Sequence, residues 1–74
     1  MSGFSDRYTV QSDEYGLLDT FSQFEKAESY GQFKASSFPD VSIYDRMARH
    51  GQWQEWRYST KHCRFVPFLK REPK

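Results

Sequence analysis

One segment of helical periodicity, set between segments of alternating polarity, constrains the fold of this chain most strongly. Phe24, Ala27, Gly31 and Ala35 are spaced by three, four and four residues, so they lie on one face of a helix. Three of these residues are small, which would let the helix lie close against a sheet. Ser22 and Glu25 match a capping box, which predicts a helix that begins at residue 23 and ends before residues 37–40.

The segments on both sides of this helix alternate apolar and polar residues, as strands with one buried face do. Residues 8–11 and 17–21, joined by turn-forming residues, predict a β-hairpin. Residues 41–45 and 53–58 predict two further strands, separated by a turn at His50 and Gly51. The sequence leaves a fifth strand at residues 63–69 open, because Pro67 lacks an amide donor and would restrict that strand to a sheet edge.

Together these elements predict an α+β fold: a single small domain with the order β-β-α-β-β, a mostly antiparallel sheet and one helix packed on one face. A chain of 74 residues can form one core and no deep cleft. We place the domain at residues 1–69 and a mobile basic tail at residues 70–74. A single helix cannot cover both faces of the sheet, so aromatic residues such as Tyr44 and Trp53 are expected on a bare face available for contact.

The residue types that carry most enzyme chemistry form no recognisable pattern. Cys63, His50 and His62 do not have the spacing of metal ligands, and the four glycines are too far apart for a phosphate-binding loop. No enzymatic activity, metal or cofactor is therefore predicted. The single cysteine, the polar start of the chain and the lack of a long apolar stretch predict a cytoplasmic location without membrane contact.

Charge is distributed unevenly along the chain, although the net charge is only +1. Three basic and eight acidic residues give residues 1–45 a charge of −5, whereas eight basic and two acidic residues give residues 46–74 a charge of +6. Two interpretations are open. The asymmetry either orients a charged partner or lets the two halves pair within the fold.

Basic and aromatic residues are interleaved in the C-terminal third of the chain. This mixture is typical of grooves that bind phosphates and stacked bases of single-stranded nucleic acid. The alternative is that the aromatic residues belong to the core and the basic residues to a solvated face. The nearly neutral chain does not favour tight binding to duplex DNA. The residues concerned are Arg46, Arg49, Arg57, Lys61, Arg64, Lys70 and Arg71, with Trp53, Trp56, Tyr58, Phe65 and Phe68.

The segment 41–56, VSIYDRMARHGQWQEW, resembles a recurring segment of small bacteriophage proteins, particularly those of phages that infect actinobacteria. The similarity extends over about residues 7–58 and includes a helix stripe like that of Phe24 and Ala27. The resemblance implies a small accessory protein that is made during infection and that binds and modulates a protein complex of the host. Asp45 within this segment either pairs with Arg46 or Arg49 across a strand or belongs to a recognition edge.

We therefore expect a non-enzymatic, phage-encoded protein-binding module that modulates or inhibits a host bacterial protein, such as a component of the transcription or defence machinery, in the host cytoplasm. The alternatives are a single-stranded nucleic-acid-binding protein and a self-associating structural protein, for example a homodimer. Tryptophan and arginine dominate interface hot spots, which guides the choice of candidate contact residues. These candidates are Tyr44, Arg46, Arg49, Trp53, Trp56 and Arg57.

Overall fold

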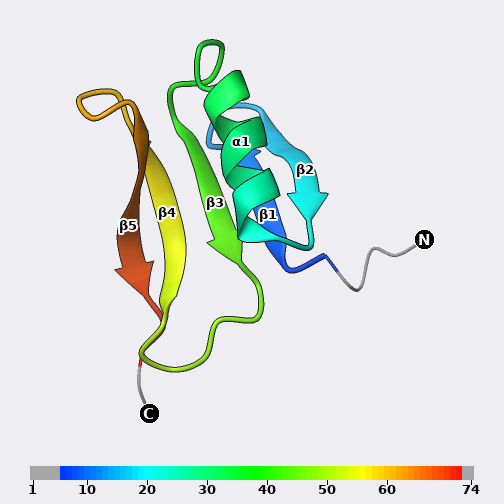
Figure 1. Ribbon diagram of the computed structural model, residues 1–74, viewed down its shortest axis with the longest axis vertical. Helices are drawn as coiled ribbons and strands as arrows, with labels where there is room; N and C mark the ends of the chain where they lie inside the picture. The colour runs from blue at the N-terminus through cyan, green and yellow to red at the C-terminus, as the bar shows by residue number, and fades with distance from the viewer. Residues whose placement is uncertain (1–5, 73–74) are drawn as a thin grey trace.

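The computed structural model describes residues 6–72, which form an open five-stranded sheet and one helix (Figure 1). All neighbouring strands are antiparallel, and their order across the sheet is β2-β1-β3-β4-β5. The predicted α+β class, with one helix on a mostly antiparallel sheet, is confirmed. The elements are β1 (Tyr8–Ser12), β2 (Gly16–Phe21), α1 (Phe24–Lys34), β3 (Val41–Asp45), β4 (Trp53–Ser59) and β5 (Arg64–Lys70).

The fifth strand forms, so the order of elements is β-β-α-β-β-β, and Pro67 lies in an edge strand. The backbone stays joined to the sheet beyond the predicted domain limit at residue 69. The amide of Arg71 donates to the carbonyl of Gln52, and its carbonyl accepts from the amide of Gly51, both at 2.8 Å. Residues 1–5 of the predicted domain and residues 73–74 of the predicted tail lie outside the described residues.

The predicted helix stripe faces the sheet. Ala27 and Gly31 are buried at its centre, and Ala35 is buried just beyond the last helical residue. At Gly31 the fit leaves no room for a side chain, because an added Cβ would lie 2.5 Å from Cζ of Phe65. Small residues in the stripe therefore let the helix approach β5 closely, as the sequence indicated.

The predicted capping box does not form. The N-cap residue is Gln23, in an extended conformation (φ −124°, ψ 139°), and no side chain caps the helix. The helix begins at Phe24, one residue later than expected. With the N-cap at Gln23, Ser22 and Glu25 are each one position too early for the reciprocal bonds of a capping box.

The core lies between α1 and the central strands. Val10, Val41 and Ile43 are fully buried there. Aromatic side chains surround this centre in contacting pairs. The ring centroids are 5.5 Å apart for Tyr8–Phe24, 4.8 Å for Phe24–Trp56, 5.3 Å for Phe21–Tyr30 and 5.4 Å for Tyr58–Phe65.

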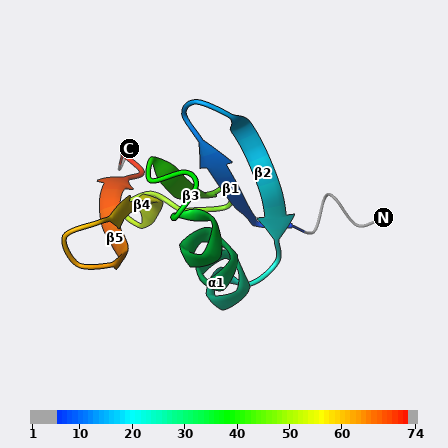
Figure 2. The same ribbon diagram turned by 90° about the horizontal axis from the view of Figure 1, so that it is seen from above.

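The single helix covers one side of the sheet only. Figure 2 shows α1 on one side, with no other helix or strand of the described chain on the opposite side. The predicted bare face is therefore present.

The β1–β2 turn is fastened to the loop that follows α1. The Ser12 hydroxyl donates to both carboxylate oxygens of Asp40 at 3.0 Å, and the amide of Glu14 donates to Oδ2 of Asp40 at 3.1 Å. Desolvation raises the pKa of Asp40, but the hydrogen bonds from Ser12 and Glu14 lower it further, so the net pKa lies below its ordinary value of 3.8. This carboxylate thus joins two segments that are far apart in the sequence.

Candidate functional site

The bare face is formed by the strand residues that alternate with the core. Val10 and Ile43 pair across β1 and β3 and are buried on the helix side. Their neighbours Thr9 and Tyr44, which also pair, must lie on the opposite side because successive strand residues alternate between faces. Tyr44 is half-buried and pairs in turn with Glu55 of β4. The open face therefore has a largely polar centre with one tyrosine.

Arg57 is the most firmly positioned charged group on this face. Its Nε donates to Oε2 of Glu55 at 3.0 Å, and its guanidinium carbon lies 4.2 Å from the centre of the Phe68 ring. The register shift in the β4–β5 pairing leaves Phe68 between the partners of Glu55 and Trp56, beside Arg57. Phe68 is 54% exposed, and the side chain of Arg57 is 44% exposed against 14% for Glu55. The accessible charge of this group is therefore positive.

The two tryptophans lie in different environments, as their alternation along β4 predicts. Trp56 lies on the helix side, where it packs against Phe24, and is unavailable as part of the bare face. Trp53, at the start of β4, is 41% exposed, and the ammonium of Lys70 lies 5.1 Å from its ring centre. Only Trp53 therefore offers a substantial exposed tryptophan surface.

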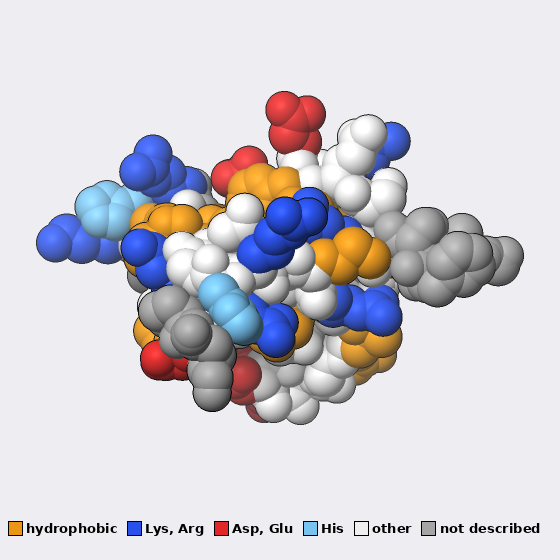
Figure 3. All heavy atoms as spheres, turned by 90° about the horizontal axis from the view of Figure 1, so that it is seen from below, with side chains coloured by type: hydrophobic (Ala, Val, Ile, Leu, Met, Phe, Trp, Pro, Cys, Tyr) orange, Lys and Arg blue, Asp and Glu red, His pale blue; other side chains and the backbone are white. Residues whose placement is uncertain are grey.

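A second surface lies at the end of the sheet where the β3–β4 loop meets both termini of the described chain. We call it the basic end and define it as residues 6–7, 46–53 and 70–72. Lys and Arg side chains spread over this end, with hydrophobic side chains between them (Figure 3). Arg46 and Arg49 come from the loop, while Lys70 and Arg71 come from the end of β5 and the residue after it.

Asp45 anchors the basic end, with a partner that the sequence did not indicate. Its carboxylate accepts two hydrogen bonds from Arg7, at 2.7 and 2.9 Å, and a third from the amide of Met47 at 2.9 Å. The hydrogen bond to Asp45 raises the pKa of Arg7 above its ordinary value. Of the two alternatives for Asp45, pairing with Arg46 or Arg49 is not found, because Asp45 points to the helix side and Arg7, in the chain before β1, is adjacent there.

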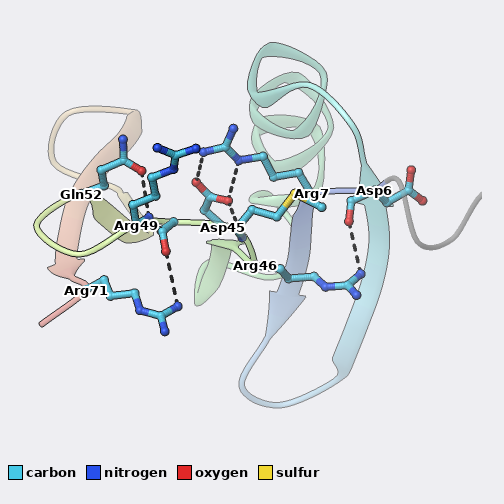
Figure 4. A network of polar contacts seen from close by, with 9 residues as sticks. Asp6, Arg7, Asp45, Arg46, Arg49, Gln52 and Arg71 are labelled. Atoms are coloured by element: carbon cyan, nitrogen blue, oxygen red, sulfur yellow. Dashed lines mark hydrogen bonds and ion pairs between the residues drawn. The ribbon is translucent and has the colours of Figure 1, made fainter. Parts of the chain in front are cut away.

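Backbone carbonyls hold two of the other arginines in place. Nη1 of Arg46 donates to the carbonyl of Asp6 at 3.2 Å, and Nη1 of Arg71 donates to the carbonyl of Ala48 at 3.3 Å. Arg49 is fixed through its backbone, whose amide donates to Oε1 of Gln52 at 2.9 Å. In Figure 4, Arg7 and Arg49 extend to one side of the β3–β4 loop, and Arg46 and Arg71 extend to the other. The guanidinium groups thus lie on two sides of the loop.

The acidic and basic halves of the chain do not neutralise each other by direct pairing. Within residues 6–72 the ion pairs are Arg7–Asp45 and Arg57–Glu55. The first lies within the acidic half and the second within the basic half. No ion pair among the described side chains therefore joins the acidic half of the chain to the basic half. The interpretation that the two halves pair within the fold is not supported.

The six candidate contact residues are distributed over three places. Tyr44 and Arg57 lie on the bare face, Trp56 lies on the helix side, and Arg46, Arg49 and Trp53 lie at the basic end. Sequence reasoning missed Phe68 as the support for Arg57, because its position depends on a register shift. The six contact candidates also leave out Lys70 and Arg71, which the sequence analysis named only for the nucleic-acid alternative.

The described residues contain no pocket and no group of side chains suited to hold a metal ion. Cys63 is exposed in the β4–β5 turn, and its backbone is in the left-handed region (φ 55°). No helix in the described part of the chain is long and apolar enough to cross a membrane.

Comparison with protein-family models, with curated proteins and with solved structures finds no match to this chain. The resemblance to small bacteriophage proteins therefore stays an expectation.

Proposed function

We propose that this chain is a non-enzymatic protein-binding module that engages an acidic surface of a partner protein through the bare face of its sheet. The observation that supports the proposal most strongly is the position of Arg57, which lies over the exposed ring of Phe68 and is held by Glu55. Arginine and aromatic residues are enriched at interface hot spots. A side chain that is already held in one geometry also loses less conformational freedom on binding.

Charge supports the choice of an acidic partner. Arg57 is the more exposed member of its ion pair, and Arg64 is exposed at the start of β5. A carboxylate of the partner can therefore approach Arg57 from solvent while Glu55 keeps the guanidinium oriented. Tyr44, in the adjacent strand, adds a half-buried aromatic side chain to the same face.

Following the resemblance to proteins of actinobacteriophages, we propose that the partner is a protein of the bacterial host and that the chain acts in the host cytoplasm to modulate or inhibit it. A component of the transcription or defence machinery would suit this role. This identification of the partner rests on the resemblance, whereas the choice of surface rests on the structure.

Affinity capture from an actinobacterial lysate tests the proposal when variants are compared. We expect a stoichiometric partner to be retained by the wild-type chain, by Lys26→Ala on the exposed face of α1 and by Arg49→Ala at the basic end. Arg57→Ala and Phe68→Ala are expected to weaken capture by about tenfold or more, as hot-spot substitutions do. A partner retained equally by all five proteins would contradict the assignment of the surface, and the lack of any stoichiometric protein would contradict the function.

A further inference from the structure

We propose that the basic end binds the phosphate backbone of single-stranded nucleic acid, with Trp53 stacking on a base. The basic end does not include Arg57 or Phe68, so this binding does not depend on the proposed protein partner.

The basic end carries an excess of positive charge that its own carboxylates do not neutralise. It has five cationic side chains, and the nearby acidic residues are Asp6, Asp45 and Glu72, which leaves a local charge of +2. Asp45 is 2% exposed and bound to Arg7, and the carboxylate of Asp6 accepts a hydrogen bond from the Thr20 hydroxyl. The cations that remain without a carboxylate partner among the described residues are Arg46, Arg49, Lys70 and Arg71.

These cations keep donors available. A guanidinium carries five N–H donors. Arg46 and Arg71 each use one of theirs on a backbone carbonyl, which fixes the group and leaves the other donors for a ligand. Arginine also matches the oxygen geometry of phosphate. Arg46 and Arg71 are therefore already held in place, so they lose little conformational freedom when they bind phosphates.

The arrangement fits an extended polyanion better than a single small anion. The charges come from separate segments and lie on both sides of the β3–β4 loop (Figure 4), and the described residues enclose no pocket that could bury one ion. A strand of nucleic acid presents a phosphate at each nucleotide and can contact several such points in turn.

Trp53 favours a single strand over an acidic protein segment or a duplex. It is 41% exposed, at the start of β4 beside the loop, and Lys70 lies against its ring. A base can stack on an exposed aromatic ring only when it is unpaired, and a cation beside that ring is well placed for the adjoining phosphate. An acidic peptide would satisfy the cations but would have no base for Trp53.

Tryptophan fluorescence of the full chain, titrated with an oligothymidine of about 12 nucleotides, tests this inference, since small single-strand-binding folds cover about 4–16 nucleotides. We expect quenching that originates from Trp53, because Trp56 packs against Phe24. Affinity should fall with salt, and the slope of log K against log salt should be about −0.7 for each phosphate neutralised.

Substitutions distinguish binding at the basic end from a non-specific attraction between the basic chain and nucleic acid. Arg49→Ala and Arg71→Ala are each expected to reduce the magnitude of the salt slope by about 0.7. Trp53→Phe should keep binding but abolish most of the quenching, and Trp53→Ala should weaken binding about tenfold through lost stacking. Arg64→Ala removes a positive charge at the other end of the seven-residue β5 and should leave both affinity and slope nearly unchanged.

Three results would overturn the inference: no binding at low salt, equal weakening by Arg64→Ala and Arg49→Ala, or equal affinity for a glutamate-rich peptide of the same charge. A duplex of the same length that binds as tightly as the single strand would overturn the stacking role of Trp53. None of these outcomes bears on capture of a protein by Arg57 and Phe68, so the two proposals can fail separately.

Discussion

At Gly31 the helix and the sheet approach too closely for any side chain. A Cβ there would lie 2.5 and 2.8 Å from two atoms of the Phe65 ring, and Phe65 is itself 6% exposed and packed against Tyr58. Overpacking of a core costs about 1–3 kcal/mol, whereas alanine gains about 1 kcal/mol over glycine in helix propensity. The steric term is therefore the larger one.

We predict that Gly31→Ala lowers the free energy of unfolding by about 1 kcal/mol, measured by chemical denaturation. Ser29→Ala, at an exposed position of the same helix, is the control and should cause no loss. Equal or greater stability of Gly31→Ala would show that the helix does not lie this close to Phe65.

Asp40 gives the stability of the chain a specific dependence on pH. Its pKa is lower in the folded chain than its ordinary value of 3.8. The stabilisation from its hydrogen bonds is therefore complete above the pKa of the unfolded chain and is lost as the pH falls through the lower folded pKa.

We predict that Asp40→Asn is less stable than wild type at neutral pH and that this difference shrinks as the pH falls below about 4. Urea denaturation at a series of pH values measures it. Asp13→Asn changes an exposed side chain for which no hydrogen bond is described and should run parallel to wild type. A difference between wild type and Asp40→Asn that is constant down to strongly acidic pH would contradict the role of the ionised carboxylate.

At the scale of elements, α1 begins without a side-chain cap. Gln23 occupies the N-cap in an extended conformation, and a short side-chain oxygen at that position would reach the free amides of the first turn. We predict that Gln23→Asp raises the free energy of unfolding by about 1 kcal/mol, partly through the helix dipole.

The matched control is Ser22→Ala, which should change stability by less than about 0.5 kcal/mol because Ser22 precedes the N-cap. Thermal denaturation of the two variants shows whether Ser22 or Gln23 is the N-cap of the helix. A large loss in Ser22→Ala, with no gain in Gln23→Asp, would restore the capping box that the sequence suggests.

The sequence predicts the elements well because each has a local pattern. Alternation marks β1, β2, β3 and β4, and the spacing of Phe24, Ala27 and Gly31 marks α1. The fifth strand was ambiguous because Pro67 is compatible with an edge strand and equally with a loop. In the structure this strand, β5, lies at an edge of the sheet.

The candidate site was predicted less completely, because contacts across the sheet have no local signature. Arg7 and Asp45 meet across 38 positions of sequence, and nothing near either residue identifies the other. Phe68 lies beside Arg57 because of a register shift in the β4–β5 pairing, and no pattern in the sequence predicts that shift. Alternation alone did separate Trp53 from Trp56, and the structure places them in different environments.

At the scale of the whole molecule, two features of the sheet bear on self-association. The centre of the bare face carries polar residues such as Thr9 and Gln11, and one edge strand contains Pro67, which cannot donate to a neighbouring strand. Both features disfavour pairing with a second copy.

We therefore predict that the chain sediments as a monomer at concentrations of about 100 μM, because such surfaces fall short of the extensive apolar contact of obligate dimers. Analytical ultracentrifugation measures this directly. A dimer that persists across the concentration series would favour the self-associating alternative.

One helix covers one side of the sheet and leaves the other side accessible (Figure 2). Nuclear magnetic resonance with a soluble paramagnetic agent tests it most directly, because the agent broadens signals of side chains that it can reach. Leu17, which pairs with Gln11, and Phe68, beside Arg57, belong to the open side. We predict strong broadening for these two residues, which are 60% and 54% exposed, and protection of Val10 and Ile43, which are fully buried beneath α1. Protection of Leu17 and Phe68 to the same degree as Val10 and Ile43 would contradict the account.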